Sequence, residues 1–528
     1  MLPKESEGCM QSPESRTQKI SVSEPDLVRT GIAGLDDILN GGIPRGNVIL
    51  VEGLIGTGKT TLGVEFVYRG ASLFDEPGII VVFEVSPDKL MRDALRFGWD
   101  LRKLEQQGRL KIVFTTRDVL RQELQQADSV LLEEAASIGA RRIFIDGVAR
   151  LVGGTGTPDS RSGFHVLTEG LQRENLTAIL AVEASSFDGN SSTSLPEESI
   201  ADTVIRIKME DSQRAIVRSL EVVKSRGQDF QMGRHSFRII NGRGVQVYRR
   251  VQAPRKPSRD RAAALDPTTR LTTGIPGLDE ITNGGYFVGS TTVVAGISGV
   301  GKSVMGLQFI AEGARRGERS LMLSLDEQVE QIMRNASTIG IDLPAHVKSG
   351  LVRVEYEPPQ EIEVDVHFHH IEELVKEFKP KRVLIDSLST YGSSLGTTGR
   401  IFRDFFHALV ALMKEYQIVA VYNHENPEML GMNSMMGNFA MSSLVDNIIL
   451  MNWIELGDSF RLGMTIAKTR ANPVNRNTHE CEVFDGHGMR VLPRDLPARK
   501  QPFSNYAGLV SRTPERRSTK VEPHESGE

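Results

Sequence analysis

The chain has 528 residues, a formal net charge of −5, and a composition that is 39% hydrophobic and 25% charged. This balance is typical of globular proteins and excludes disorder along the whole chain, and the negative charge argues against a protein that mainly coats nucleic acid. Two cysteines, Cys9 and Cys481, cannot form a disulfide framework or a four-cysteine zinc site. No apolar run reaches about 18 residues, and the polar N-terminus lacks a signal-peptide core, so we expect a cytoplasmic protein without a membrane span.

A repeat of domain length organises the chain. Residues 30–71 and 273–314 align without a gap at an offset of 243, and 20 of these 42 positions are identical. Further along the chain, the segment that ends at Asp146 recurs at Asp386, an offset of 240, and Lys224 recurs at Lys468, an offset of 244. Because this repeat is far longer than a solenoid unit, we expect two domains of the same fold.

Composition sets the expected boundaries. Residues 1–25 are rich in Ser, Glu and Pro and are expected to be disordered. Residues 26–250 and 270–495 form the two domains, and residues 251–269 form a basic linker that we expect to be solvated, although it could contact an acidic partner. The polar tail, residues 496–528, is expected to be flexible.

Short apolar runs alternate with helical patterns in each repeat, for example the helical patterns at 86–97 and 327–339. Nearly continuous Val, Ile and Leu runs are typical of strands buried on both faces of a parallel sheet. Hairpin-like strands follow at 214–227 and 460–472. We therefore expect α/β domains with a mainly parallel central sheet flanked by helices. The predicted central strands are 47–53, 78–84, 141–146 and 177–183 in the first repeat and 290–296, 319–325, 381–386 and 417–423 in the second.

A glycine-rich motif, G-x-x-x-x-G-K-[ST], follows the first central strand and opens a helix in each repeat. Its glycines let backbone N–H groups wrap phosphates, and the helix N-terminus adds a favourable dipole. Two occurrences in matching context argue against a glycine-rich turn that binds nothing. The predicted ATP ligands are Gly53, Gly56, Thr57, Gly58, Lys59, Thr60 and Thr61 in the first domain and Gly296, Ser298, Gly299, Gly301, Lys302 and Ser303 in the second.

Acidic residues end two further strands of each repeat. Asp146 and Asp386 are predicted to hold Mg²⁺ together with the P-loop hydroxyls of Thr60 and Ser303. A group is also needed to orient or deprotonate the attacking water, and Glu84 is the candidate in the first domain. In the second domain the candidates are Asp326, which is one methylene shorter, and Glu327, and the choice between them stays open.

Two Lys-x-Arg pairs, Lys224 with Arg226 and Lys468 with Arg470, lie far along the chain from their own P-loops. In one interpretation they reach ATP on a neighbouring subunit, as an arginine finger does in trans. In the other they are solvated charges at a strand end. The Asp365–His370 cluster lacks a second ligand group, so we expect no metal there. The loops at 153–163 and 392–399 either face a central pore or are simple connections.

The motif TGIxGLDxxxxGG, followed by a P-loop in each repeat, and the segment RFGWDL at 96–101 resemble the KaiC family of circadian-clock ATPases over roughly residues 27–495. The resemblance implies two tandem RecA-like P-loop NTPase domains, in whose class a strand-end glutamate is catalytic. It also implies homohexamers of two stacked rings with ATP and Mg²⁺ at subunit interfaces. The first ring of such proteins is a slow ATPase, and the second phosphorylates and dephosphorylates its own Ser and Thr.

The resemblance places Ser442 and Ser443 at the family's phosphoacceptor positions, although these serines could simply begin a strand or turn. Val85 removes the second carboxylate of the family's Glu-Glu pair, Asp326 alters the base of the kinase site, and Ala471 replaces a glycine. The C-terminal tail does not match the segment that binds KaiA.

The expected function is therefore that of a KaiC-like double-ring ATPase, with serine/threonine autokinase activity in the second domain, acting in circadian timing or signal transduction. Partners would be its own copies and KaiB-like or other signalling proteins, without nucleic acid or membrane. The alternatives are a RecA/RadA-like DNA-binding ATPase and an ATP-sensing scaffold without kinase activity.

Overall fold

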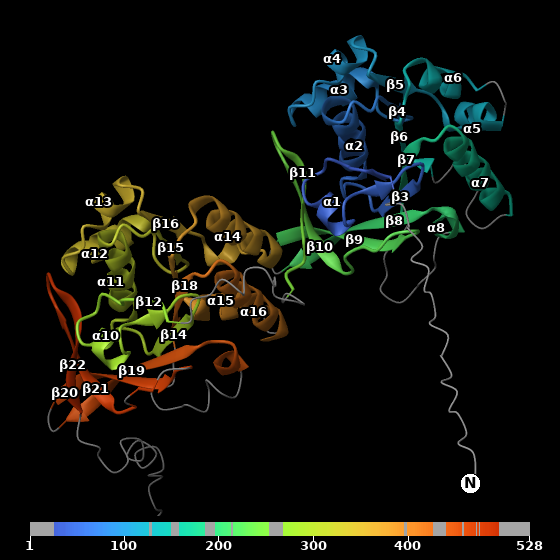
Figure 1. Ribbon diagram of the computed structural model, residues 1–528. Helices are drawn as coiled ribbons and strands as arrows, with labels where there is room; N and C mark the ends of the chain where they lie inside the picture. Colours follow the sequence, from blue (N-terminus) through green and yellow to red (C-terminus); the bar gives the residue numbers. More distant parts are fainter. Residues whose placement is uncertain are drawn as a thin grey trace, which may run out of the picture. The chain divides into compact units, whose positions relative to one another are not determined.

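Figure 1 shows the computed structural model of the chain, which divides into two compact units, unit 1 (Met1–Arg249) and unit 2 (Arg250–Glu528). Our expectations for residues 1–25 and 496–528, for most of the linker at 251–269 and for part of the loops at 153–163 and 392–399 fall outside the described residues. The structure describes residues 26–125, 129–148, 158–184, 196–212, 215–252, 268–394, 399–425, 440–456, 459–470, 473–474 and 476–495.

Unit 1 contains β1 (Leu27–Val28), α1 (Leu35–Ile38), β2 (Ile43–Pro44), β3 (Val48–Gly53), α2 (Lys59–Leu73), β4 (Gly78–Val82), α3 (Pro87–Leu95), α4 (Leu101–Gln106), β5 (Leu110–Phe114), α5 (Arg117–Gln125), α6 (Val130–Ser137), β6 (Arg142–Asp146), α7 (Pro158–Arg173), β7 (Thr177–Glu183), α8 (Pro196–Ile200), β8 (Thr203–Ser212), β9 (Ala215–Ser225), β10 (Arg234–Ile240) and β11 (Gly244–Tyr248).

Unit 2 contains β12 (Arg270–Leu271), α10 (Leu278–Ile281), β13 (Tyr286–Phe287), β14 (Thr291–Gly296), α11 (Lys302–Arg315), β15 (Ser320–Ser324), α12 (Val329–Thr338), α13 (Leu343–Lys348), β16 (Val352–Tyr356), the 3-10 helix η2 (Pro359–Glu361), α14 (Val364–Phe378), β17 (Arg382–Asp386), α15 (Leu388–Ser394), α16 (Gly399–Glu415), β18 (Val419–Glu425), the 3-10 helix η3 (Ala440–Ser443), β19 (Asn447–Leu456), β20 (Ser459–Lys468), β21 (Thr478–Phe484) and β22 (Gly488–Asp495).

Each unit is built on a nine-stranded sheet. The strand order is β11-β10-β9-β8-β3-β7-β6-β4-β5 in unit 1 and β16-β15-β17-β18-β14-β19-β20-β21-β22 in unit 2. The six strands from β8 to β5 pair in parallel, and β8 to β11 form an antiparallel extension. The predicted fold class, two tandem RecA-like domains with mainly parallel sheets, is confirmed.

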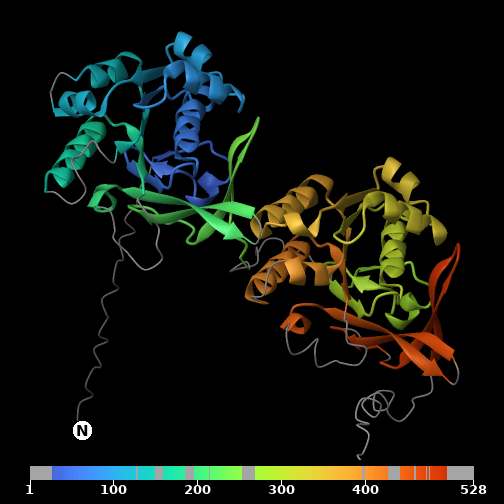
Figure 2. The same cartoon turned by 180° about the vertical axis from the view of Figure 1, so that it is seen from behind.

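The central strands are mostly apolar because helices cover both faces of the sheet. In β3, Ile49 and Val51 belong to the core that includes α2, whereas Val48 and Leu50 belong to the core that includes α7. Figure 2 shows these layers from behind. Among the described residues, no helix combines the length and apolar character needed to cross a bilayer.

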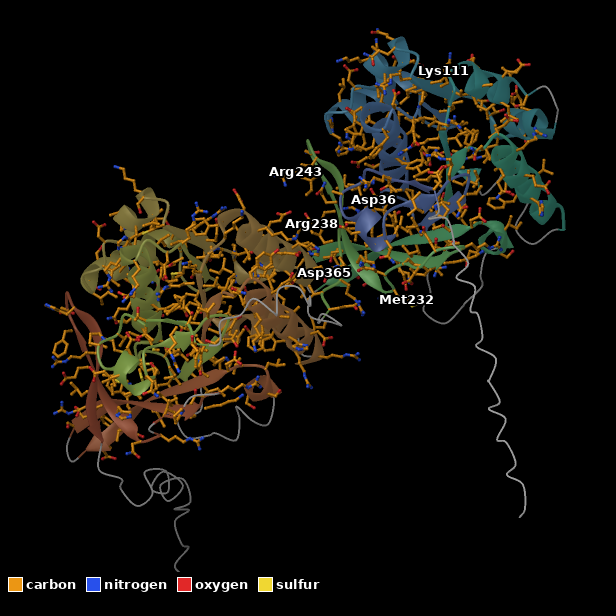
Figure 3. All side chains as sticks on the ribbon, viewed as in Figure 1. Asp36, Lys111, Met232, Arg238, Arg243 and Asp365 are labelled. Atoms are coloured by element: carbon orange, nitrogen blue, oxygen red, sulfur yellow. The ribbon has the colours of Figure 1, made fainter. Side chains whose placement is uncertain are left out.

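The repeated TGIxGLD motif forms a closed turn before the sheet. The Asp36 carboxylate, which is labelled in Figure 3, accepts hydrogen bonds of 2.7 Å from both the backbone N–H and the hydroxyl of Thr30. In unit 2 the Thr273 N–H donates to Asp279 at 2.7 Å. A Cβ on Gly34 would lie 1.8 Å from a backbone oxygen of β11, so this close approach requires glycine.

In each unit a fully buried arginine at the start of a central strand, β6 or β17, hydrogen-bonds to residues that precede this strand in the chain. Arg142 donates to Glu76 through Nε at 2.7 Å and to the carbonyls of Phe66 and Arg29 at 3.0 and 2.8 Å. Arg382 occupies the same place in unit 2 and pairs with Glu318, and burial lowers the pKa of both guanidinium groups.

We predict that Arg142→Ala lowers the free energy of unfolding of unit 1 by about 2–4 kcal/mol, because Glu76 keeps only Arg45 as its partner and the carbonyls of Phe66 and Arg29 lose a buried donor. Trp99 lies in unit 1 and Trp453 in unit 2, so Trp99 fluorescence during urea unfolding in a Trp453→Phe background reports on unit 1. Arg173→Ala, on an exposed side chain, is the control. A loss below about 1 kcal/mol would contradict the prediction.

Candidate nucleotide site

Both P-loops lie between a buried central strand and a long helix, where their motif predicts them. Gly58 and Gly301 stand immediately before α2 and α11 with φ angles of 108° and 86°, a conformation that favours glycine. A Cβ on Gly56 or Gly299 would meet nothing within 4 Å, so their positive φ angles, rather than crowding, account for glycine there.

The P-loop lysines are bound by their own loops. Lys59 Nζ donates to the carbonyls of Gly53 and Leu54, both at 2.8 Å, and Lys302 Nζ donates to those of Gly296 and Ile297 at 2.9 and 2.7 Å. Burial lowers the pKa of each lysine, and nearby carboxylates oppose this shift. Each ammonium group is thus held at the loop that would surround the phosphates.

The remaining predicted loop ligands differ in exposure. Thr57 is buried and its hydroxyl donates to the Leu54 carbonyl at 2.9 Å, so this side chain stabilises the loop from within. Thr61 is half-buried at the start of α2, and Ser298 is exposed.

The predicted Mg²⁺ ligands come together in both units. The Thr60 hydroxyl donates to Asp146 at 2.8 Å, and the Ser303 hydroxyl donates to Asp386 at 2.7 Å. Burial is the main cause that raises the pKa of both carboxyl groups. Hydroxyl and carboxylate oxygens are the hard donors that Mg²⁺ prefers, so these residues fit the ion.

The candidate catalytic carboxylates have different partners. Glu84 Oε1 accepts from Arg117 at 2.7 Å, and Asp326 Oδ1 accepts from the Thr390 hydroxyl at 2.6 Å. Glu327 instead accepts from Asn335 of α12 at 3.0 Å. The negative charge of Asp326, after those of Glu425 and Asp386, raises the pKa of Lys302 and so opposes the effect of burial. Asp326 thus interacts with the P-loop lysine, whereas Glu327 contacts α12, and the choice between the two as the base stays a prediction.

The basic pairs bind backbone carbonyls within their own units. Lys224 donates to Ala201 at 2.6 Å and Arg226 to Ser199 at 2.8 Å, at the end of α8. The predicted contact with a neighbouring subunit stays a prediction.

In unit 2 the same arrangement lies next to the candidate phosphoacceptors. Lys468 donates to the carbonyls of Ser442 and Val445, and Arg470 donates to that of Ser443. Both serines lie in η3 rather than in a strand, and Ser443 is the more exposed.

Sequence reasoning missed four residues of the site: Arg117, Thr390, Glu183 and Glu425. Glu183 and Glu425 pair in register with the first P-loop glycine of their unit and interact electrostatically with Lys59 and Lys302. They recur at an offset of 242, a signal that could have found them. Arg117 and Thr390 recur nowhere in matching positions, so the repeat gave no signal.

The histidine cluster of α14 has structural partners. His367 is buried between Glu357 and Tyr391, which hydrogen-bond its two ring nitrogens. Asp365 accepts from the Val251 N–H at 2.9 Å. In the described ranges, no group of three or more His, Cys, Asp or Glu side chains is placed to hold a metal ion.

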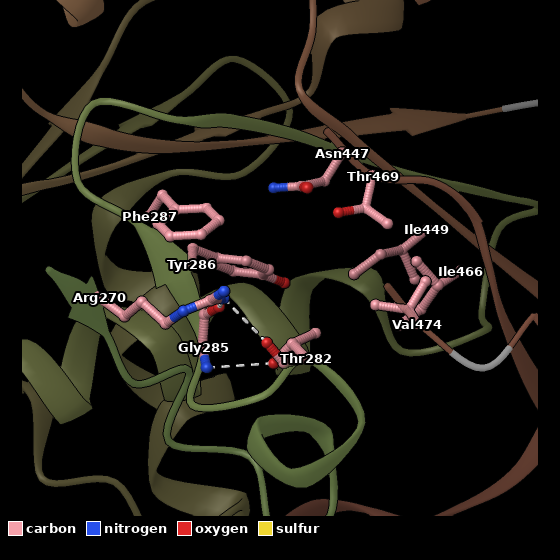
Figure 4. A pocket seen from close by; sticks show the side chains of 10 residues that line it. All are labelled: Arg270, Thr282, Gly285, Tyr286, Phe287, Asn447, Ile449, Ile466, Thr469 and Val474. Carbon is pink, nitrogen blue, oxygen red and sulfur yellow. Dashed lines mark hydrogen bonds between the residues drawn. The ribbon is translucent and has the colours of Figure 1, made fainter. Parts of the chain in front are cut away.

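A pocket of unit 2 lies between β13, the turn after α10 and strands β19 and β20 (Figure 4). The guanidinium of Arg270 lies over the ring of Phe287, 3.7 Å from its centroid. None of the predicted nucleotide ligands lines this pocket.

Two P-loops at the carboxyl ends of parallel strands, each with a hydroxyl–carboxylate pair, define a tandem RecA-like P-loop ATPase. A family model described as "ATPase: KaiC" matches residues 28–252 and again 271–495. The chain therefore belongs to the KaiC family.

Curated relatives match along almost the whole chain. The circadian clock oscillator protein KaiC of Picosynechococcus sp. is 30% identical over 498 residues, covering 93% of this chain and 92% of that protein. KaiC of Thermostichus vulcanus is 29% identical over 512 residues, with 95% and 94% covered. The circadian clock protein KaiC3 of Synechocystis sp. is 29% identical over 501 residues, with 93% and 94% covered.

Unit 1 carries a buried acid beside its P-loop that unit 2 lacks. Glu52, at 1% exposure, precedes Gly53, whereas the matching residue of unit 2 is Ala295. Arg206 donates to Glu52 at 3.1 Å and to Glu198 of α8 at 3.3 Å. Burial, followed by the charge of Glu198, raises the pKa of Glu52 to about 7.

We predict that the raised pKa of Glu52 makes the free energy of unfolding of unit 1 decrease as the pH rises. Its ordinary pKa is 4.5, so between about pH 4.5 and 7 the folded state retains a proton that the unfolded chain releases, and stability falls across that window. Glu52→Gln should reduce the loss between pH 5 and 8 by about 1–3 kcal/mol, measured by Trp99 fluorescence in urea. Glu169→Gln is the exposed control, and an unchanged pH slope would refute the prediction.

Proposed function

We propose that this protein is an ATP-hydrolysing homohexamer of two stacked rings, with serine/threonine autokinase activity in unit 2, that acts in circadian-type timing or signal transduction. The observation that carries the proposal is the P-loop with its joined hydroxyl and carboxylate, present in both units. The names of the relatives, which describe clock oscillator proteins, support the timing role. We also propose domains at 26–250 and 270–495 and a cytoplasmic location.

Nucleotide binding follows from the loop geometry. When ATP binds, Lys59 or Lys302 exchanges its loop carbonyls for β- and γ-phosphate oxygens, and the loop N–H groups donate to the same oxygens. The Thr60–Asp146 and Ser303–Asp386 pairs would hold Mg²⁺, which when bound supplies neutralisation of the phosphate charge.

Hydrolysis requires a base at the strand end. Glu84 in unit 1 and Asp326 in unit 2 are the carboxylates that would orient the attacking water and accept its proton. The bond from water oxygen to the γ-phosphorus forms as the bond to the β–γ bridging oxygen breaks, which leaves ADP and phosphate. Lys224, Arg226, Lys468 and Arg470 would stabilise the transferring group on a neighbouring subunit.

Phosphotransfer in unit 2 would use the same chemistry with a serine hydroxyl as nucleophile. Ser442 or Ser443 would attack the γ-phosphorus, and Asp326 would accept the hydroxyl proton. Lys468 and Arg470, which already contact the backbone of both serines, lie where they could stabilise the added charge.

We predict that Lys59→Ala and Lys302→Ala each weaken ATP binding at one unit by about tenfold or more, because a charge-assisted hydrogen bond is lost. Equilibrium binding of a fluorescent ATP analogue should show two sites of which one is weakened, and gel filtration with ATP should show impaired assembly. Lys111→Ala, on the exposed lysine labelled in Figure 3, is the control. Unchanged affinity and unchanged size in both variants would contradict the model.

Incubation with Mg-ATP should place phosphate on Ser442 or Ser443, detected by phosphopeptide mapping. The double variant Ser442→Ala with Ser443→Ala should lose this phosphate while retaining ATP hydrolysis in unit 1. Ser337→Ala, an exposed serine of α12, should leave the map unchanged. Absence of phosphate on both serines would favour an ATP-sensing scaffold without kinase activity.

A further inference from the structure

The candidate catalytic carboxylates, Glu84 and Asp326, are each linked by hydrogen bonds to the turn that follows the strand of the predicted Mg²⁺ ligand. This strand is β6, which ends at Asp146, in unit 1 and β17, which ends at Asp386, in unit 2. We propose that Arg117 in unit 1 and Thr390 in unit 2 are positioning residues that fix Glu84 and Asp326 for hydrolysis. This inference rests on the proposed ATPase function and adds two residues that the repeat does not share.

In unit 1 a guanidinium makes the link. Arg117, the first residue of α5, donates through Nη2 to Glu84 Oε1 at 2.7 Å and through Nε to the Gly147 carbonyl at 3.0 Å. Gly147 directly follows Asp146 at the Mg²⁺ site. The Arg117 guanidinium also lies 5.2 Å from the centroid of the Phe83 ring. The arginine is thus held from two sides and in turn holds one oxygen of a glutamate.

The side chains of Arg117 and Glu84 differ in exposure, and this difference indicates that the arginine restrains the glutamate. The Arg117 side chain is 27% exposed, whereas that of Glu84 is 76% exposed. An exposed glutamate without a partner samples many rotamers, and a misplacement of about 1 Å of a reacting group can cost about 100-fold in rate. Since Arg117 contacts only Oε1, the second carboxylate oxygen is left for water.

In unit 2 a hydroxyl cluster makes the corresponding link. Thr390, the third residue of α15, donates to Asp326 Oδ1 at 2.6 Å, and its oxygen lies 3.0 Å from the hydroxyl of Ser387. Ser387 directly follows Asp386 and lies 2.8 Å from the Ser389 hydroxyl. Ser389 accepts from the Glu425 N–H at 3.2 Å, which joins the cluster to the end of β18.

The two links are not inherited from a common repeat. Arg117 stands three residues after β5, and the residue three after β16 is Pro359, which has no side-chain donor. Thr390 comes from a different element, the helix after the Mg²⁺-site strand. Two unrelated side chains therefore make the same connection between strand end and turn, which argues for a shared requirement rather than for shared packing.

The two carboxylates are held by donors of different size. Glu84 is held by a long, planar guanidinium that keeps its own second anchor at Gly147. Asp326 is one methylene shorter, and the small hydroxyl of Thr390 reaches it from a helix that begins two residues after Asp386. The two donors thus differ in size and come from different elements, α5 in unit 1 and α15 in unit 2.

The test uses full-length protein with one ATP site disabled. The Asp326→Asn background reports on unit 1 and the Glu84→Gln background on unit 2, because each removes the candidate base of the other unit and leaves both P-loop lysines in place. Arg117→Gln and Thr390→Val should each lower kcat of the reporting unit by about tenfold, with KM and ADP affinity unchanged. Thr390→Ser should restore the parent rate, and Arg117→Lys should restore part of it. Arg173→Gln and Thr338→Val, on exposed surfaces, are the matched controls.

A second readout requires no turnover. Binding of ADP with aluminium fluoride, which imitates the transferring phosphoryl group, should weaken in Arg117→Gln and Thr390→Val relative to binding of ADP alone. If the parents bind nucleotide but hydrolyse none, the proposed ATPase function fails, and this comparison still decides the positioning roles.

Several results would overturn the inference. An increase in kcat would show that the contacts restrain the carboxylates instead of positioning them. An equal loss of ADP and analogue binding, or no change in either readout, would assign both residues to packing. Phosphate recovered on Thr390 would make that residue a phosphoacceptor and would remove its positioning role.

Discussion

The parallel pairing of the central strands is the constraint on which both sites depend. Parallel strands end at one edge of a sheet, so β3, β4, β6 and β7 deliver the P-loop and three acidic residues to a common place. The buried Val, Ile and Leu runs that specify this pairing therefore also specify the chemistry. Helices bury both faces of these central strands, and the acidic residues of the candidate site lie where the strands end.

The two units share this sheet and differ in the ionisable residues beside their P-loops. Unit 1 has Glu52 beside its P-loop, where unit 2 has an alanine. In unit 2, His424 ends up near Lys302, and burial lowers the pKa of its imidazole to about 4. The chain therefore has two candidate nucleotide sites on the same fold, and the ionisable groups beside them differ. The two sites can respond differently to the same pH.

Much of this arrangement could be predicted from sequence, because the pattern is local or repeated. The eight central strands followed from apolar runs, and the Thr60–Asp146 and Ser303–Asp386 pairs followed from motif and strand ends. The sequence did not indicate Arg117, Thr390 or the Glu52–Arg206 pair. These contacts join positions far apart in the chain, and none recurs among the described residues of the other unit, so neither spacing nor repetition marks them.

The P-loop lysines have a further consequence. Each ammonium group is bound to two carbonyls of its own loop, so the loop itself supplies hydrogen-bond partners for this charge. Capture of ATP would then be an exchange of partners, in which phosphate oxygens replace carbonyl oxygens around the ammonium group. The affinity for ATP would then measure only the difference between the two sets of contacts.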